Sequence, residues 1–201
     1  MIKLVYGVGI SEKGEFKRTV ATVDKRVATK EYRLWKGLLE RCYSEKYQQK
    51  RPTYLGCSVS EDFKYFQRFA KWCQRQIGFG LDGYHIDKDI LICGNRVYGE
   101  DTCVFVPSSI NLALIKCNAA RGDCPVGVSW NKQSQKYIAQ CNTGDGCGPK
   151  YLGSFSTPEA AHTIYKAFKE VLIKQLASEY QHVLDPRTFK ALLSYEVNID
   201  D

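Results

Sequence analysis

The chain has 201 residues, of which 44% are hydrophobic and 25% are charged, and these proportions exclude a wholly disordered protein. Lys and Arg outnumber Asp and Glu by 29 to 22, a formal net charge of +7, which suits a polyanionic partner without requiring one. No apolar run approaches the roughly 20 residues of a membrane-spanning helix, so we expect no membrane association.

The first part of the chain predicts a hairpin and two helices. Two β-prone runs flank a glycine-containing turn between Leu4 and Val23, a pattern typical of a β-hairpin. Thr29 is a residue type that caps helices, and apolar residues recur at helical spacing from there to Tyr43. We expect a second amphipathic helix to begin at Ser60. Its aromatic-rich face is assigned to the core: Phe63, Phe66, Phe69, Ala70 and Cys73.

The middle of the chain has β-β-α order. Residues 85–93 and 102–107 resemble strands, Gly94-Asn95 provides a turn between them, and a short helix is expected from Ser108. A turn-rich hinge follows at residues 121–125.

Three further strands are expected at residues 126–130, 137–141 and 151–155. The helix after them has Thr157 as its cap and Pro158 at its first position. One apolar stripe marks that helix: Ala160, Ile164, Ala167, Phe168 and Val171.

These elements predict an α+β protein with an N-terminal hairpin and helices, a ββα core and a C-terminal three-stranded antiparallel sheet packed on a helix. We expect two domains, residues 1–120 and residues 121–201. The region 25–51 is rich in Lys and Arg, which is compatible with a phosphate-facing surface and equally with a solvated helix face.

The nine cysteines favour neither disulfides nor zinc. No Cys-x-x-Cys pair occurs, so we expect no structural zinc. The first residues lack the apolar core of a signal peptide, so we expect a cytoplasmic protein with reduced thiols. Cys42, Cys73 and Cys103 lie among apolar neighbours and are expected to be small core residues.

A series of short motifs runs through the C-terminal segment: Gly127-Val128, Lys136-Tyr137-Ile138-Ala139, the run 151–157, Glu159-Ala160-Ala161 and Tyr165. In these motifs the segment resembles the plant ethylene-response-factor (APETALA-type) DNA-binding domain over about fifty residues. The resemblance implies binding to double-stranded DNA through the sheet, which a major groove can admit. The plant domains have arginines where Ser129 and Asn142 stand, so we expect phosphate and shape contacts to dominate over base reading.

Alternation along the strands suggests which side chains of this sheet are exposed to DNA. For Trp130 and Tyr151, packing at the edge of the core is the alternative. The candidates are Trp130, Lys132, Lys136, Gln140 and Tyr151.

The middle segment, together with Trp35, the run 41–43, Phe66 and Trp72, resembles phage-encoded HNH (His-Me finger) proteins that carry a C-terminal APETALA-like module. That family uses a histidine as general base, a divalent metal such as Mg²⁺ and an Asn that orients the base. The resemblance assigns the base to His85, the orienting role to Asn95, and metal ligation to Asp87, Asp89 and Asn111.

The sequence also departs from an active nuclease core. Tyr84 stands where the family has Asp or His before the base, and the second strand has Thr102 and Cys103 where the orienting Asn is usual. The preferred interpretation is therefore a DNA-binding protein with a degenerate nuclease core. Two alternatives remain open: an active metal-dependent endonuclease, and a phage product that binds and inhibits a host protein.

Overall fold

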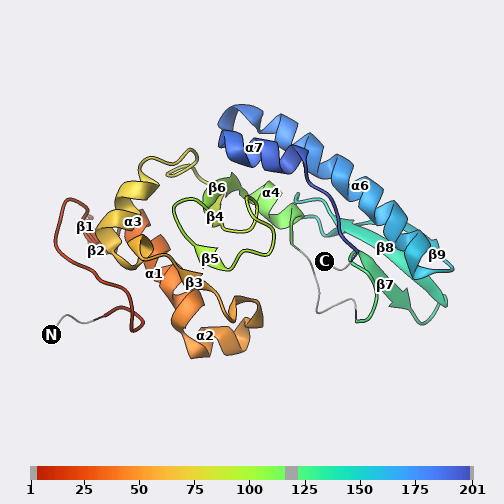
Figure 1. The fold of residues 1–201 in the computed structure, drawn as a ribbon, viewed down its shortest axis with the longest axis horizontal. Helices are drawn as coiled ribbons and strands as arrows, with labels where there is room; N and C mark the ends of the chain where they lie inside the picture. The colour runs from red at the N-terminus through yellow and green to blue at the C-terminus, as the bar shows by residue number, and fades with distance from the viewer. Residues whose placement is uncertain (1–3, 116–121, 200–201) are drawn as a thin grey trace. The chain divides into compact units, whose positions relative to one another are not determined.

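The computed structural model describes residues 4–115 and 122–199, and it has the α+β class expected from the sequence (Figure 1). The chain divides into two compact units, Met1–Phe105 and Val106–Asp201, which we describe separately. The sequence predicted a domain boundary between residues 120 and 121, and both of these residues lie outside the described ranges. None of the helices in the described part of the chain has the length and apolarity needed to cross a bilayer.

Two helices pack together in the first unit. Helix α1 (Lys30–Tyr43) begins as predicted at Thr29, whose Oγ1 accepts the N–H of Tyr32 at 3.3 Å. Helix α3 (Phe66–Cys73) starts later than predicted, because a 3₁₀ turn, η2 (Asp62–Lys64), follows Ser60, whose Oγ accepts the N–H of Phe63, and because Tyr65 is extended. The predicted aromatic face is confirmed as core. Side chains that are at most 1% exposed line the interface: Trp35, Leu38, Leu39, Phe63, Phe66, Phe69, Ala70 and Cys73.

Three buried thiols are confirmed as core residues of the first unit. Cys42, Cys73 and Cys103 are each at most 5% exposed. Burial raises the pKa of Cys42 and of Cys103 to about 12, so both are neutral thiols at physiological pH.

Short elements complete the first unit: α2 (Glu45–Lys50), η1 (Pro52–Tyr54), β3 (Ser58–Val59), β4 (Tyr84–Asp87), β5 (Val97–Tyr98) and β6 (Val104–Pro107). Strand β3 pairs in parallel with β5, and β4 pairs with β6, the strand in which the unit ends. The strand expected over residues 85–93 is wrong beyond Asp87, because the chain turns there and is held by side chains described below.

The hairpin predicted over residues 4–23 is wrong in position. The observed hairpin joins β1 (Thr19–Ala21) to β2 (Arg26–Ala28). The residues before this hairpin contact the α3 region instead. Ile10 forms backbone hydrogen bonds with Lys64 and Phe66, and the side-chain amide of Gln67 forms hydrogen bonds with the N–H and the carbonyl of Phe16.

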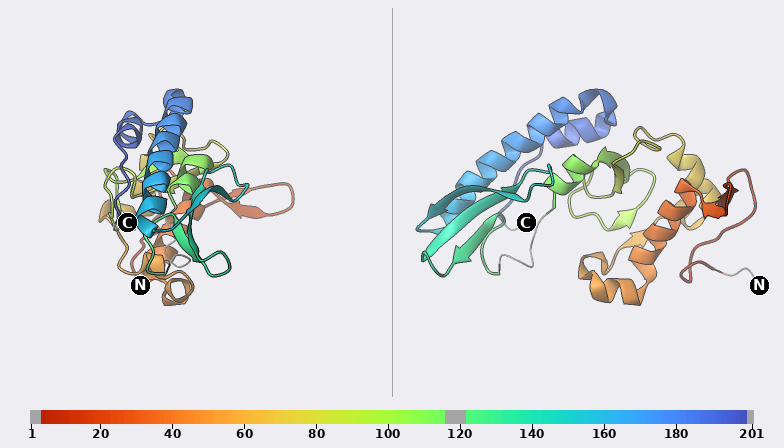
Figure 2. Two further views of the ribbon diagram at one scale, coloured as in Figure 1. Left: turned by 90° about the vertical axis from the view of Figure 1, so that its right-hand side faces the viewer. Right: turned by 180° about the vertical axis from the view of Figure 1, so that it is seen from behind.

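The second unit contains a three-stranded antiparallel sheet in the order β7 (Val128–Asn131), β8 (Lys136–Asn142) and β9 (Pro149–Phe155). Helix α6 (Pro158–Glu179) lies along one face of this sheet (Figure 2). Thr157 caps it as predicted, since its Oγ1 accepts the N–H of Ala160. The other described helices are α4 (Ser108–Ala113), η3 (Gln181–Val183) and α7 (Pro186–Leu193).

The apolar stripe noted on α6 is not the face that the helix buries. Ile164 and Val171 are 42% and 55% exposed. Two polar side chains take part in the buried face, since Nδ1 of His162 donates to the carbonyl of Val126 and Lys169 donates to the carbonyl of Ala113. The buried residues of the helix are Ala161, His162, Tyr165, Lys169, Ile173, Leu176 and Ala177.

Candidate nucleic-acid interface

The strand register divides the side chains of the three-stranded sheet into two faces. Residues that pair directly across two strands lie on the same face. Val128 pairs with Ala139, and both are buried with Ala161 of α6, so this row faces the helix. By alternation the neighbouring rows face away from α6. The face away from the helix, called the outer face below, consists of Ser129, Asn131, Lys136, Ile138, Gln140, Asn142, Pro149, Tyr151 and Ser154.

Most residues of the outer face have side chains that can form hydrogen bonds. Gln140 pairs directly with Tyr151, whose side chain is 61% exposed. Lys136 is also exposed on this face, whereas Lys132 lies in the turn between β7 and β8. Three of the five sequence-predicted contact residues therefore lie on one surface, with Lys132 at its end.

Trp130 lies on the opposite face from these residues. It pairs in register with Tyr137, and the two ring centroids are 4.7 Å apart. Tyr137 packs against the cluster under α6, so Trp130 extends that packing at the open end of the sheet while remaining 41% exposed. The expectation that Trp130 shares the outer face is wrong, because Trp130 has the same strand parity as the buried Val128.

The residues that carry the family resemblance are mainly packing residues. Gly127 has φ +77°, and a Cβ there would lie 2.1 Å from Cδ2 of Tyr165, so the close approach of the tyrosine ring requires glycine. Gly153 has φ +144° at the point where the β8–β9 register shifts, which is a conformation that favours glycine. Ala139 and Ala161 are completely buried between sheet and helix.

The two positions that hold arginine in the plant domains have short polar side chains here. Ser129 and Asn142 both lie on the outer face and are half-buried. Oδ1 of Asn142 accepts the backbone N–H of Gly144 at 3.0 Å, so part of its hydrogen-bonding capacity is used within the loop. A guanidinium fork for guanine is therefore missing at these positions.

The second unit contains a cavity of about 250 Å³. Residues of the sheet, among them Ser129, Gln140 and Asn142, and two residues of α6, Tyr165 and Lys169, line it. Lys169 is 2% exposed. Sequence reasoning missed this lysine, because a Lys on a long helix is ordinarily a solvated residue.

The first unit contains four of the five residues that the nuclease resemblance singled out. Strand β4 places His85 and Asp87 on one face, opposite the buried Ile86. His85 is exposed, and its ring has no hydrogen-bond partner within the described residues. Asn111 lies on α4 of the second unit.

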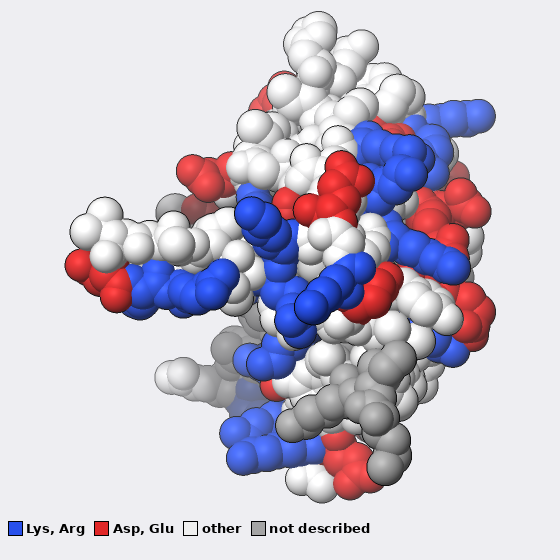
Figure 3. Space-filling model, turned by 90° about the vertical axis from the view of Figure 1, so that its left-hand side faces the viewer, with Lys and Arg blue, Asp and Glu red and all other residues white. Residues whose placement is uncertain are grey.

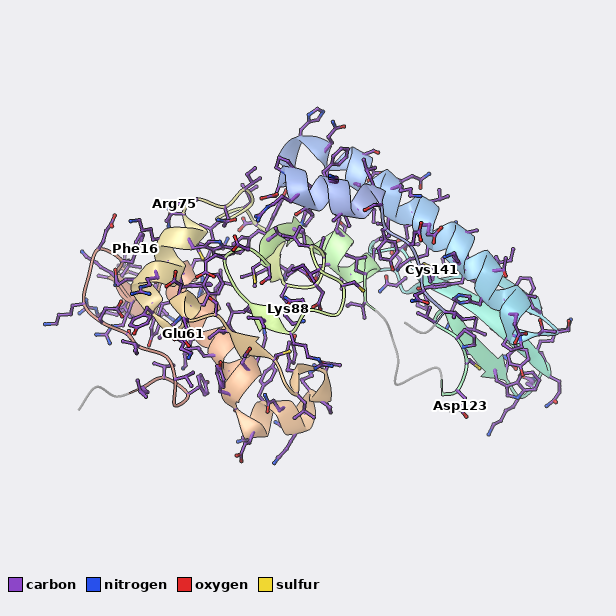
Figure 4. The ribbon with its side chains drawn as sticks, in the orientation of Figure 1. Phe16, Glu61, Arg75, Lys88, Asp123 and Cys141 are labelled. Atoms are coloured by element: carbon purple, nitrogen blue, oxygen red, sulfur yellow. The ribbon has the colours of Figure 1, made fainter. Side chains whose placement is uncertain are left out.

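The remaining residues of the set hold the turn after β4 together. Oδ1 of Asp87 accepts the N–H groups of Asp89 (2.7 Å) and Ile90 (2.9 Å). Lys88, labelled in Figure 4, is 9% exposed and donates to the carboxylate of Asp89 and to the carbonyl of Asn95. Nδ2 of Asn95 donates to the carbonyls of Lys88 and Val97, both at 2.8 Å.

The two carboxylates of this set are engaged by neighbouring groups of the protein. Burial raises the pKa of Asp87, although the two backbone N–H donors oppose the shift, so its ionised form is disfavoured. The ammonium of Lys88 is the counter-ion of Asp89. Across residues 4–115 and 122–199, no three His, Cys, Asp or Glu side chains form a metal-binding group.

Asn95 has a backbone-holding role in this arrangement. Its amide is engaged by two carbonyls, and its Oδ1 accepts the N–H of Val97 at 3.1 Å. No described hydrogen bond joins it to His85.

Comparisons with known proteins add no family to this geometry. No protein-family model matches the chain, and neither the curated proteins nor the solved structures that were searched contain a match.

Proposed function

We propose that this chain is a double-stranded-DNA-binding protein of the phage HNH homing-endonuclease type, in which the nuclease-like core serves as a scaffold. Its C-terminal APETALA-like module contacts DNA through the outer face of the sheet. The place of action in this proposal is the cytoplasm of an infected bacterium.

One observation carries the proposal: the residues of the family motif pack the sheet against α6, and the opposite face presents polar groups to solvent. Gly127, Gly153 and Tyr165 account for the tight packing. Gln140, Tyr151 and Lys136 are then left exposed on one β-surface. A β-surface of this kind matches the width of the DNA major groove, where amide and hydroxyl groups can meet base edges or phosphates.

The scaffold interpretation of the first unit is supported by the turn after β4. The side chains that would hold a metal and orient the base instead stabilise the backbone between residues 87 and 97. His85 remains as an exposed histidine without the partner that would fix its tautomer.

DNA binding is tested with the full chain and a fluorescent 30-base-pair duplex of mixed sequence, by fluorescence anisotropy. We expect the double variant Gln140→Ala/Tyr151→Ala to bind roughly 5- to 100-fold more weakly than wild type. The matched control is Val171→Ala/Gln175→Ala, which truncates exposed side chains of α6, and it should bind like wild type. Equal binding by both double variants would remove the outer face from the interface.

The scaffold role is tested separately with supercoiled plasmid and Mg²⁺. Wild type should leave the plasmid intact at protein concentrations that saturate the duplex. Nicking by wild type that His85→Ala abolishes would overturn the scaffold role in favour of an active endonuclease.

A further inference from the structure

The net positive charge of the chain is confined to its first quarter. Residues 1–51 contain 13 Lys and Arg and six Asp and Glu, whereas residues 52–201 contain 16 of each. The second unit, residues 106–201, contains ten basic and nine acidic residues. The APETALA-like module is therefore nearly neutral, although phosphate neutralisation supplies most of the affinity of proteins for DNA.

Six basic residues of the first quarter lie on or beside the β1–β2 hairpin and on the helix that follows it, α1. Lys17 and Arg18 lie at the foot of the β1–β2 hairpin, Lys25 lies in its turn and Arg26 begins β2; all four are exposed. Arg33 and Lys36 are exposed on α1, one helical turn apart. Figure 3 shows Lys and Arg side chains along a projecting ribbon and on the face beside it. We call these six residues the basic surface.

The hairpin is joined to α1 through one residue. Oγ1 of Thr29 donates to the carbonyl of Lys17 at 2.9 Å and accepts the N–H of Tyr32, and the N–H of Thr29 donates to the carbonyl of Arg18. The hairpin turn is closed by hydrogen bonds between Thr22 and Lys25. The basic side chains are thus carried on a structured ribbon attached to the helix.

The cations of the basic surface differ from Lys64, Arg68 and Lys88 in having no acidic partner. Lys64, Arg68 and Lys88 each pair with a neighbouring carboxylate. Within the described part of the chain, no ion pair involves a residue of the basic surface. These cations are therefore available to an external anion.

The carboxylates of α1 are engaged by neutral groups. Oε1 of Glu31 accepts from Nε2 of Gln74 at 2.6 Å, and Glu40 is hydrogen-bonded with the Tyr6 hydroxyl. Asp24, in the hairpin turn, is the acidic residue of the hairpin itself. Local acids thus offset the field of the basic surface only partly.

We propose that the basic surface binds the phosphate backbone of duplex DNA and supplies the sequence-independent part of the affinity, while the outer face of the second unit makes the contacts at base edges. A two-stranded ribbon has dimensions that a major groove accepts, and its Lys and Arg side chains can reach phosphates on either side. This inference rests on the proposed DNA-binding function.

The test compares two double variants that each remove two positive charges from the first unit of the full chain. Lys25→Gln/Arg26→Gln removes unpaired cations of the hairpin, and Lys64→Gln/Arg68→Gln removes cations that have acidic partners. Duplex affinity is measured by anisotropy between 50 and 300 mM NaCl. We expect the hairpin variant to bind roughly fivefold or more weakly at 100 mM NaCl, with a log-log salt slope less steep by about 1 to 2. The control should keep the wild-type slope.

Each other outcome has a definite meaning. If wild type binds duplex DNA and both variants lose affinity equally, net charge alone explains the effect, and the proposed role of the basic surface is overturned. If the hairpin variant binds like wild type, the basic surface is overturned while the proposed function stands. If wild type binds no duplex, both proposals fail. Circular dichroism melting should be unchanged in the hairpin variant, since its side chains make no described contacts.

Discussion

Lys88 and Asn95 each hold the backbone of the other. Nζ of Lys88 donates to the carbonyl of Asn95 at 2.8 Å, and Nδ2 of Asn95 donates to the carbonyl of Lys88 at 2.8 Å. The ammonium of Lys88 also lies 5.7 Å from the ring centroid of the buried Tyr98. This reciprocal pair closes the turn between β4 and β5 and anchors it on the core of the first unit.

Replacing Asn95 should therefore cost stability. Asn95→Ala removes three hydrogen bonds and leaves the carbonyl of the buried Lys88 without its donor. We expect the free energy of unfolding to fall by about 1–3 kcal/mol, measured by urea denaturation with circular dichroism. Gln49→Ala, at an exposed position of α2, is the control and should change it by less than about 0.5 kcal/mol. Unchanged stability in Asn95→Ala would contradict the backbone-holding role of Asn95 and favour the alternative that it orients His85.

Local signals were sufficient to predict the first residue of two helices. Thr29 and Thr157 each cap a helix at the residue that the sequence indicated, because an N-cap depends on hydrogen bonds within one turn. The hairpin near the N-terminus was misplaced, since Ile10 and Phe16 are held by residues of the α3 region more than 50 positions away. No local pattern contains such contacts.

The faces of elements were harder to predict than the elements themselves. Helix α6 has apolar residues on two sides, and its buried side includes His162 and Lys169, which take part through hydrogen bonds to backbone carbonyls. Periodicity counts apolar residues and cannot register such polar contacts. Trp130 was placed on the wrong face for a related reason: strand parity depends on which residue first meets the helix.

Gly127 should be irreplaceable on two grounds, backbone conformation and space. Gly127→Ala must adopt φ near +77° and also displace the ring of Tyr165, so we expect a loss of about 2–4 kcal/mol in urea unfolding. Gly146 provides a matched control, because it has φ +79° and no atom lies within 4 Å of an added Cβ. Gly146→Ala should cost only the left-handed backbone, about 1–2 kcal/mol. Equal losses would mean that the tyrosine ring gives way freely.

The opposite placement of Trp130 and Tyr151 predicts opposite phenotypes. Trp130→Ala removes the ring that packs on Tyr137 and should lower the unfolding free energy by about 1–2 kcal/mol, with the duplex affinity of the folded protein unchanged. Tyr151→Ala removes a side chain that is 61% exposed and should reduce affinity while leaving stability within about 0.5 kcal/mol of wild type. Duplex affinity is measured by anisotropy titration and stability by urea denaturation for both variants. A lower duplex affinity of Trp130→Ala, measured where the variant is fully folded, would contradict the assignment of Trp130 to the helix side of the sheet.

The carboxyl of Asp87 should make the first unit more stable in mildly acidic solution than at neutral pH. Burial raises its pKa above the ordinary value of 3.8 in the folded state, so the folded chain binds this proton more tightly than the unfolded chain. The destabilising contribution is absent below the unfolded pKa and develops as the pH rises through the raised folded pKa.

Asp87→Asn keeps an oxygen that can accept the N–H groups of Asp89 and Ile90 and removes the buried charge. We expect it to raise stability at pH 7 by about 0.5–1 kcal/mol and to flatten the pH dependence of urea midpoints above the unfolded pKa. A destabilised Asp87→Asn protein, or one whose pH profile follows wild type, would show that the ionised carboxylate is the form this turn requires.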